Sequence, residues 1–297
     1  MFKRLKNKST GILTYADYKK PWFKVLYITI LLLLFVAVLT AVTPLLWLFI
    51  SSFKDASELT ATPYHLFPEN FDLHKLAEVW QMLDFGKYFL NTLVVVVGAV
   101  VCSVFFNGIL AYTFAIVKPK GYRIFYGMVL ASYMIPAVTS IVPLYKQIVD
   151  LGMVNTYIPL WFMFGANAFY LITFKNYFES LPKALFEAAE MDKCGKWKAF
   201  FTIVIPLSKP IIGVVAIFTM TAAWSDFLLP YLVLDNDEMM TVIVKIYSLQ
   251  STMGSLVGFG PDKLLMLLTI SILPQIVIFA VFQRQITGSS TQGAIKE

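Results

Sequence analysis

Residues 187–206 read EAAEMDKCGKWKAFFTIVIP and form a polar interval between two long apolar stretches. The interval carries charges of both signs, which are costly inside hydrocarbon. The stretches on either side of it, near residues 157–174 and 210–234, are apolar enough to cross a membrane. We therefore expect the interval to be a structured loop in water that another protein contacts.

The whole chain has the composition of a membrane protein. Of its 297 residues, 58% are hydrophobic and 14% are charged, and the mean hydropathy is +0.72. So little polar surface does not cover a soluble globule of this size. We expect an all-α polytopic fold with six transmembrane helices, near residues 25–50, 88–117, 124–145, 157–174, 210–234 and 264–283.

Basic residues next to the apolar spans predict the orientation. The N-terminal tail, residues 1–24, is rich in lysine, whereas residues 51–86 and 235–263 hold more acidic than basic residues. Because lysine and arginine favour the cytoplasmic side, both termini are predicted to be cytoplasmic. The transmembrane domain then covers residues 25–286, with a cytoplasmic loop at 179–208 and a cytoplasmic C-terminal tail at 287–297. The expected location is the inner, or cytoplasmic, membrane of a bacterium.

Several classes of function are disfavoured by the residues present. The two cysteines, Cys102 and Cys194, lie in an apolar span and a polar loop and do not have metal-ligand spacing. The net charge of +6 comes from residues beside the ends of spans, so nucleic acid is not the expected partner. The spans hold no Ser–His or paired-aspartate arrangement, which argues against an intramembrane enzyme.

A helix with two distinct faces is predicted early in the cytoplasmic loop. Ser180 is expected to cap it, with Pro182 in its first turn. Small and apolar residues, Leu181, Ala184, Leu185, Ala188 and Met191, recur every three or four positions beside a charged stripe of Lys183, Glu187 and Glu190. The alanines favour a shallow groove on a protein, and the alternative is a helix lying on the membrane surface.

The loop resembles the EAA loop of ATP-binding-cassette importer permeases. Glu187, Ala188 and Ala189 open it, Ile203 stands where the family has isoleucine, and Pro206 closes it. The family's glycine is replaced by Lys193, and because a lysine disfavours a left-handed backbone, we expect Gly195 to supply the turn instead. Weaker similarities select the carbohydrate branch: the start of the second span, the prolines of the third, the W-x-x-F-x-x-P pattern at 224–230 and the ending at 293–296.

The resemblance implies a permease subunit of an importer of a sugar, a di- or oligosaccharide. Its implied partners are a second permease, two ATP-binding-cassette ATPases, an extracellular or periplasmic solute-binding protein and membrane lipids. The chain has no G-x-x-x-x-G-K-[ST] phosphate loop, so ATP and Mg are expected to be bound by the ATPases and no cofactor by this chain. The residues implied in ATPase coupling are Glu187, Ala188, Ala189, Asp192, Gly195 and Pro206.

The substrate path has four candidate residues: Asn167, Tyr170, Trp224 and Asp226. An asparagine inside the membrane more often forms a hydrogen bond between helices than it binds a substrate. We expect this structural role for Asn91, Asn107 and Asn167. A carboxylate within an apolar span must face protein or water, so for Asp226 a packing role and a pathway role both stay open.

The outer loop at 235–263 is the predicted docking segment for the solute-binding protein. An apolar run at Val242, Ile243, Ile246 and Leu249 predicts a short amphipathic helix at the membrane surface. The docking contacts are assigned to Ser251, Gly254, Ser255 and Gly258, and the alternative is a slack turn without a partner.

A rival interpretation is an ion-coupled secondary transporter of a small solute. Such a transporter needs ionisable residues buried in the spans as a relay, and the apolar cores offer almost none besides Asp226.

Overall fold

The computed structural model describes residues 21–251 and 258–292, and in this part of the chain helices are joined by turns and loops, without a β-strand. The prediction of an all-α fold is confirmed for these residues. The chain divides into two units, Met1–Asp72 and Leu73–Glu297. The C-terminal residues 293–297, which carry the predicted tail similarity, lie outside the described residues.

The first unit consists mainly of one long apolar helix, α1 (Pro21–Ser51). Its 31 residues rise about 46 Å at 1.5 Å per residue, enough to cross a bilayer. The predicted first span is therefore present as a helix. After it, α2 (Ala56–Leu59) is followed by a loop that folds back, so that the rings of Phe53 and Phe71 stack with their centroids 4.1 Å apart.

The second unit begins with α3 (His74–Met82) and an unbroken helical stretch from Phe85 to Val117. That stretch contains α4 (Phe85–Cys102), the π-helix η3 (Ser103–Asn107), α5 (Gly108–Tyr112) and the π-helix η4 (Thr113–Val117). It agrees with the second predicted span. A π-helical turn widens the helix by one residue and shifts the side chains that follow it.

The third predicted span, residues 124–145, is not a straight helix. The structure has α6 (Tyr122–Tyr133), the 3₁₀ turn η5 (Ala137–Ser140) and α7 (Ile141–Asp150), with a bend of 100° between the two arms. Pro136 lies at the bend. A proline has no amide hydrogen and disfavours helical backbone at the residue before it, so the chain turns here.

The fourth and fifth predicted spans are each broken once. Residues 157–174 fall into α8 (Ile158–Gly165) and α9 (Ala168–Glu179). Residues 210–234 fall into α13 (Lys209–Ser225) and α14 (Leu228–Val233), separated at Asp226. The ring of a proline clashes with the carbonyl four residues earlier, and Pro230 stands four residues after Asp226, which accounts for the second break.

The remaining elements are α10 (Lys183–Met191), α11 (Lys196–Ala199), η6 (Phe200–Val204), α12 (Ile205–Leu207), η7 (Asp237–Met239), α15 (Val242–Ser251) and α16 (Pro261–Gln292). α16 contains the sixth predicted span and continues through the first six residues of the predicted tail at 287–297. Within the described residues, three helices are long and apolar enough to cross a membrane, or five when each sharply bent pair counts as one span. The number of six spans stays a prediction.

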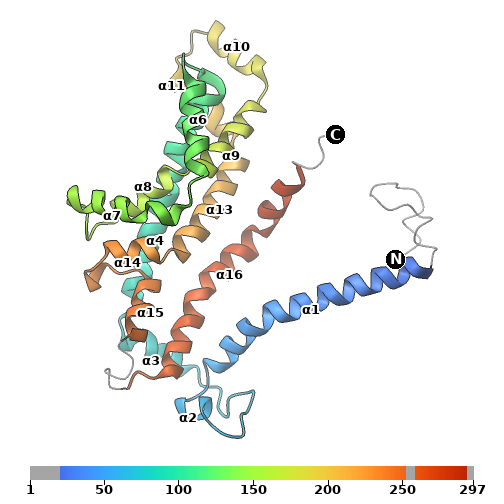
Figure 1. Ribbon diagram of the computed structural model, residues 1–297, viewed down its shortest axis with the longest axis vertical. Helices are drawn as coiled ribbons and strands as arrows, with labels where there is room; N and C mark the ends of the chain where they lie inside the picture. Colours follow the sequence, from blue (N-terminus) through green and yellow to red (C-terminus); the bar gives the residue numbers. More distant parts are fainter. Residues whose placement is uncertain (1–20, 252–257, 293–297) are drawn as a thin grey trace. The chain divides into compact units, whose positions relative to one another are not determined.

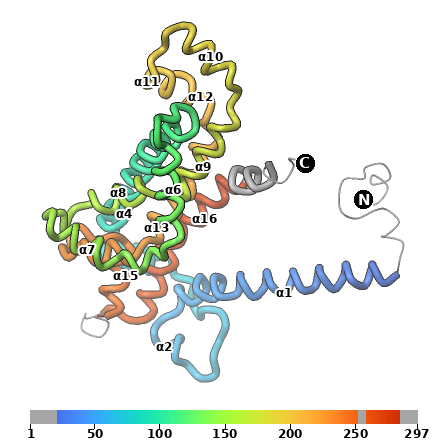
Figure 2. Tube along the Cα trace, turned by 45° about the horizontal axis from the view of Figure 1, so that its top comes forward, coloured from blue at the N-terminus to red at the C-terminus, as the bar shows by residue number. Residues whose placement is uncertain are grey.

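The core of the second unit lies where α4, α8, α9 and α13 run side by side, as two views show (Figures 1 and 2). Fully buried side chains fill it, among them Ala99, Phe174, Phe178 and Val215. Gly98 and Gly165 allow α4 and α8 to approach closely, because an added Cβ would meet Trp161 at the first position and Phe106 at the second. In this unit α10 and α11 lie at one end, and α3 and α15 lie at the other (Figure 1).

Candidate functional site

The predicted cytoplasmic loop, residues 179–208, folds into α10 and α11, joined by a tight turn at residues 192–195. The turn has the hydrogen bonds of a helix-ending Schellman motif. The backbone amide of Cys194 donates to the carbonyl of Ala189 at 2.8 Å. The backbone amide of Lys193 donates to the carbonyl of Glu190 at 3.0 Å. In this motif the residue just before the donor of the longer bond, here the residue before Cys194, has a positive φ.

Lys193 is that residue, with a φ of +53°. The expectation that Gly195 would supply the left-handed turn is therefore wrong. Gly195 has φ −62° and ψ 149°, an extended backbone that any residue adopts, and precedes α11. The hydrogen bond from Cys194 to Ala189 closes a turn of six residues and so fixes which residue has the positive φ. Lysine therefore takes the strained left-handed conformation at the position where the family has glycine.

Ser180 also has a different role from the predicted one. It ends α9, and its hydroxyl donates back to the carbonyl of Tyr177 at 2.6 Å. α10 starts after Pro182, whose fixed φ suits the entry to a helix.

Three of the six predicted coupling residues are exposed on α10 or directly after it. Glu187, Ala188 and Asp192 are exposed, and Ala189 is the buried residue of the helix. Two large apolar side chains of this loop are also exposed: Met191 on α10 is 84% exposed, and Trp197 on α11 is 66% exposed. Such an exposed apolar face next to carboxylates is typical of a surface that a protein partner covers.

The inner side of this loop is fastened to the helical core by two tyrosines. The hydroxyl of Tyr112, at the end of α5, donates to the carbonyl of Lys196 at 3.1 Å, and its ring packs 5.2 Å from that of Phe200. The hydroxyl of Tyr177 donates to the carbonyl of Leu207 at 3.0 Å, next to the exposed Pro206. With Phe200 almost fully buried, a displacement of α11 must move the core as well.

Two of the path candidates, Asn167 and Tyr170, build the break between α8 and α9. The side-chain oxygen of Asn167 accepts from the backbone amide of Tyr170 at 3.2 Å and so caps α9. The backbone amide of Asn167 donates to the side-chain oxygen of Asn107 at 3.1 Å. Asn107 in turn donates to the carbonyl of Phe164 at 2.9 Å. Tyr170 is buried. The reading of Asn107 and Asn167 as hydrogen-bond glue fits these contacts.

Trp224 lies at the C-terminal end of α13, and Asp226 directly follows that helix. The indole of Trp224 is buried, donates to the carbonyl of Ser271 in α16 at 3.0 Å and meets the ring of Phe89 edge-on at 5.0 Å. Asp226 is half-buried and lies at the break between α13 and α14. Trp224 therefore has a packing role within this chain, and Asp226 marks the end of α13.

The predicted outer loop is held against the start of α4 by a set of polar contacts, named here the outer clasp: Lys87, Tyr88 and Asn91 of α4 with Asp237, Glu238 and Lys245. The carboxylate of Asp237 accepts from Tyr88 at 2.8 Å and from Lys245 at 2.5 Å. Lys87 pairs with Glu238, and the amide of Asn91 donates to the carbonyls of Glu238 and Met240 at 2.9 and 3.0 Å. Asn91 thus binds a loop rather than another spanning helix.

Opposing effects act on the charges of the outer clasp. Partial burial raises the pKa of Asp237, but the hydrogen bonds from Lys245 and Tyr88 outweigh it and hold that pKa below its ordinary value. Burial lowers the pKa of Lys245, and its bonds to Asp237 and Tyr88 bring it above the ordinary value. Both groups are therefore charged around neutral pH.

α15 is the helix predicted in the outer loop, but its apolar face does not lie on the membrane surface. Val242, Ile246 and Leu249 are buried, and the helix packs against α4 and α16. Ser251 ends α15 and is exposed, and Gly258 has a φ of +77°. The docking candidates Gly254 and Ser255 lie outside the described residues.

Residues 105–288 match the family described as binding-protein-dependent transport system inner membrane component. The match covers the core helices α8, α9 and α13, the predicted cytoplasmic loop and most of α16, and it begins after α4. The chain belongs to this family.

Two relatives resemble the permease over most of their length. The diacetylchitobiose uptake system permease protein NgcG of Streptomyces coelicolor is 32% identical over 257 residues, covering 86% of this chain and 84% of the relative. The arabinooligosaccharides transport system permease protein AraQ of Bacillus subtilis is 30% identical over 280 residues, covering 93% and 98%. The chain is accordingly a membrane permease of the carbohydrate importer type rather than an enzyme.

A solved structure has the same fold. It is a bacterial ABC transporter involved in the import of the acidic polysaccharide alginate, and one of its chains superposes with a TM-score of 0.78 at 23% identity, covering 93% of this permease and 99% of that chain. At this identity the likeness concerns the fold.

Sequence reasoning missed the tyrosines that fasten the permease's loops. Tyr88 and Asp237 are 149 residues apart, and Tyr112 and Lys196 are 84 apart. In the sequence alone, neither tyrosine can be told apart from the other aromatic residues that are common near the ends of membrane spans. A contact of this kind leaves no periodic signal in the sequence, so only the folded chain identifies it.

Proposed function

We propose that this permease forms the translocation path of an ATP-driven bacterial importer of a di- or oligosaccharide, together with a second permease. Two ATPase subunits bind ATP and Mg and drive it, and an extracellular or periplasmic solute-binding protein delivers the sugar. Six spans place both termini and the loop at 179–208 in the cytoplasm, in keeping with the basic residues beside the spans. The names of the two relatives support an oligosaccharide substrate.

The observation that carries this proposal is the outward-facing α10, which a tight turn joins to the anchored α11. Glu187 and Ala188 are exposed on it beside Met191, while Tyr112 and Phe200 fix the loop to the core. We infer that α10 docks in a cleft of the ATPase, with Glu187 facing a basic residue there. Closure of the two ATPases then moves the loop and, through it, the helices around the path, which shifts the balance between inward-open and outward-open states.

The outer clasp supports a matching role at the opposite end. We infer that residues 251–258 receive the solute-binding protein, because they follow α15 in a loop whose earlier part is fastened to α4 through Asp237 and Glu238. Single cysteines at Ser251 and Gly258 are expected to crosslink to the binding protein when the ATPases are trapped closed. Crosslinks from residues 56–69 alone would assign docking to the first outer loop.

Growth and uptake of a deletion strain test the proposed function. Loss of the chain is expected to abolish uptake of at least one oligosaccharide among diacetylchitobiose, raffinose, arabinotriose and maltotriose, and a plasmid copy is expected to restore it. Purification of the complemented complex in detergent is expected to yield co-eluting ATPase subunits. Normal uptake of every saccharide tested, with no ATPase in the purified complex, would contradict the proposal.

A further inference from the structure

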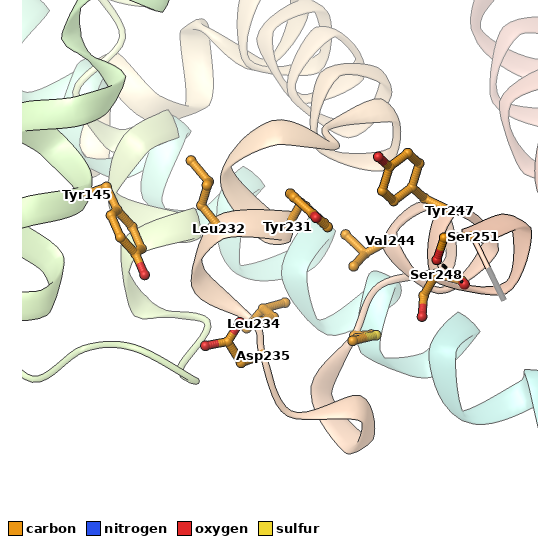
Figure 3. A pocket seen from close by; sticks show the side chains of 10 residues that line it. Tyr145, Tyr231, Leu232, Leu234, Asp235, Val244, Tyr247, Ser248 and Ser251 are labelled. Carbon is orange, nitrogen blue, oxygen red and sulfur yellow. Dashed lines mark hydrogen bonds between the residues drawn. The ribbon is translucent and has the colours of Figure 1, made fainter.

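A cavity of about 380 Å³ opens between α7, α14 and α15, at the same end of the second unit as the outer clasp. Figure 3 shows Tyr145 on α7 at one side, Tyr247 and Ser251 on α15 at the other, and Tyr231 between them. Its volume lies in the range of about 300–1,000 Å³ typical of small-molecule sites.

Aromatic rings form one wall of this cavity. Tyr231 and Tyr247 meet edge-on with ring centroids 5.3 Å apart, and Phe227 packs against both, at 5.2 and 4.9 Å. The three-ring cluster fixes the two tyrosines, yet each is 45% exposed. A rigid, accessible ring presents a face of negative potential, which attracts the weakly positive C–H groups of a sugar ring.

The rest of the lining combines four apolar side chains, Leu232, Leu234, Met240 and Val244, with polar groups, and it has no positive charge. It includes the exposed carboxylate of Asp235 and the hydroxyl groups of Tyr145, Ser248 and Ser251, and none of the ten lining residues is basic. Hydroxyls and a carboxylate can accept and donate the many hydrogen bonds that sugar hydroxyls require. A carboxylate without a basic partner in the lining disfavours a phosphate or a uronate.

We propose that this cavity is a subsite for one ring of a neutral saccharide at the outer mouth of the translocation path. Tyr231 and Tyr247 stack on the ring, and Asp235 with Ser248 and Ser251 bonds its hydroxyls. The inference rests on the proposed function and narrows its substrate to uncharged saccharides. It also places the subsite next to Ser251, at the start of the segment assigned to docking, where a binding protein would release its sugar.

The test is saturation-transfer NMR on the intact complex in nanodiscs, with its partner permease and ATPases but without the binding protein. The probes are diacetylchitobiose, raffinose, arabinotriose and maltotriose, with an alginate trisaccharide as the anionic counterpart. The saccharide whose uptake depends on this chain is expected to show saturation of its ring protons, and the alginate trisaccharide none. In the double variant Tyr231→Ala, Tyr247→Ala the signal is expected to fall at least five-fold.

Two further variants make the result decisive. Ser251→Trp fills the cavity while keeping both tyrosines, and is expected to abolish the signal. Tyr133→Ala removes a tyrosine that is 57% exposed on α6, away from the cavity, and is expected to leave the signal unchanged. Each variant is first checked for co-elution with the ATPases, which shows that the complex is assembled.

The outcomes separate this inference from the proposed function. A neutral saccharide that is taken up through the chain but gives no signal, or the same signal in Ser251→Trp, would overturn the subsite while leaving the importer intact. Uptake of the alginate trisaccharide alone would overturn the neutral selectivity. Uptake of all five saccharides without this chain would overturn the proposed function itself.

Discussion

The amide nitrogen of Cys194 lies 2.8 Å from the carbonyl oxygen of Ala189, across a lysine whose φ is +53°. This bond ends the helix that carries Glu187 and sets the direction in which the chain re-enters the core. A left-handed backbone costs a residue with a Cβ roughly 1–2 kcal/mol. The turn of the proposed coupling loop is therefore formed at a cost that glycine would avoid.

Lys193→Gly is expected to stabilise this turn by about 1 kcal/mol, because glycine adopts a positive φ freely. Hydrogen exchange of the peptide containing Cys194 should slow roughly five-fold. Lys198→Gly is the matched control, since it places glycine inside α11 and should speed exchange. Equal exchange in wild type and Lys193→Gly would contradict the assignment of strain to this residue.

Glu187→Lys is expected to leave the protein in the membrane but to reduce saccharide uptake at least ten-fold. The reason is that it reverses the charge of an exposed residue on α10 without touching the core. Uptake per amount of membrane-inserted protein is the measurement. Asp150→Lys, an equal reversal at the exposed end of α7, should keep uptake within two-fold. Normal transport by the Glu187→Lys complex would refute the docking role.

Gly98→Ala is expected to destabilise the permease by about 1–3 kcal/mol, because the new methyl group on α4 would overlap the indole of Trp161 on α8. Thermal unfolding of the detergent-solubilised protein reports the change. Gly127→Ala on α6 is the control, since a Cβ there meets nothing within 4 Å and should be neutral or stabilising. An equal shift of the unfolding midpoint in both variants would contradict this expectation, because it would mean that α8 moves away from α4 without cost.

The stability that the outer clasp contributes is expected to fall as the pH is lowered from neutrality into the acid range. The folded-state pKa of Asp237 is depressed, so its contribution is present above the unfolded pKa and is lost as pH falls through the folded value, which lies below 3.8. The pKa of Lys245 is raised above 10.5, so its contribution is lost only as pH rises through that value. The pair is therefore intact from about pH 5 to pH 9.

Asp237→Asn imitates the acid form at neutral pH. Hydrogen exchange in residues 236–245 is expected to be faster in this variant than in wild type at pH 7, because Lys245 and Tyr88 lose their charged acceptor. Asp235→Asn, which removes a neighbouring exposed carboxylate outside the clasp, should leave exchange there unchanged. Equal protection in Asp237→Asn and wild type would show that backbone bonds alone hold the loop.

The helical fold and the ends of the loops followed from the sequence, because apolar spans, prolines and basic flanks act locally. The breaks inside spans did not follow fully. Pro136 explains the bend of the third span, whereas the break at Asn167 depends on its bond to Asn107, sixty residues away. Likewise the strain at Lys193 depends on where α10 ends, which capping bonds decide and composition does not.

The source of energy for transport tests the central claim most directly. The complex, reconstituted into proteoliposomes with binding protein outside, is expected to accumulate saccharide only when ATP and Mg are enclosed, and to continue when ionophores collapse every ion gradient. The Glu187→Lys complex should fail under the same conditions. Accumulation driven by an imposed proton or sodium gradient without ATP would contradict the account and assign the chain to the ion-coupled transporters.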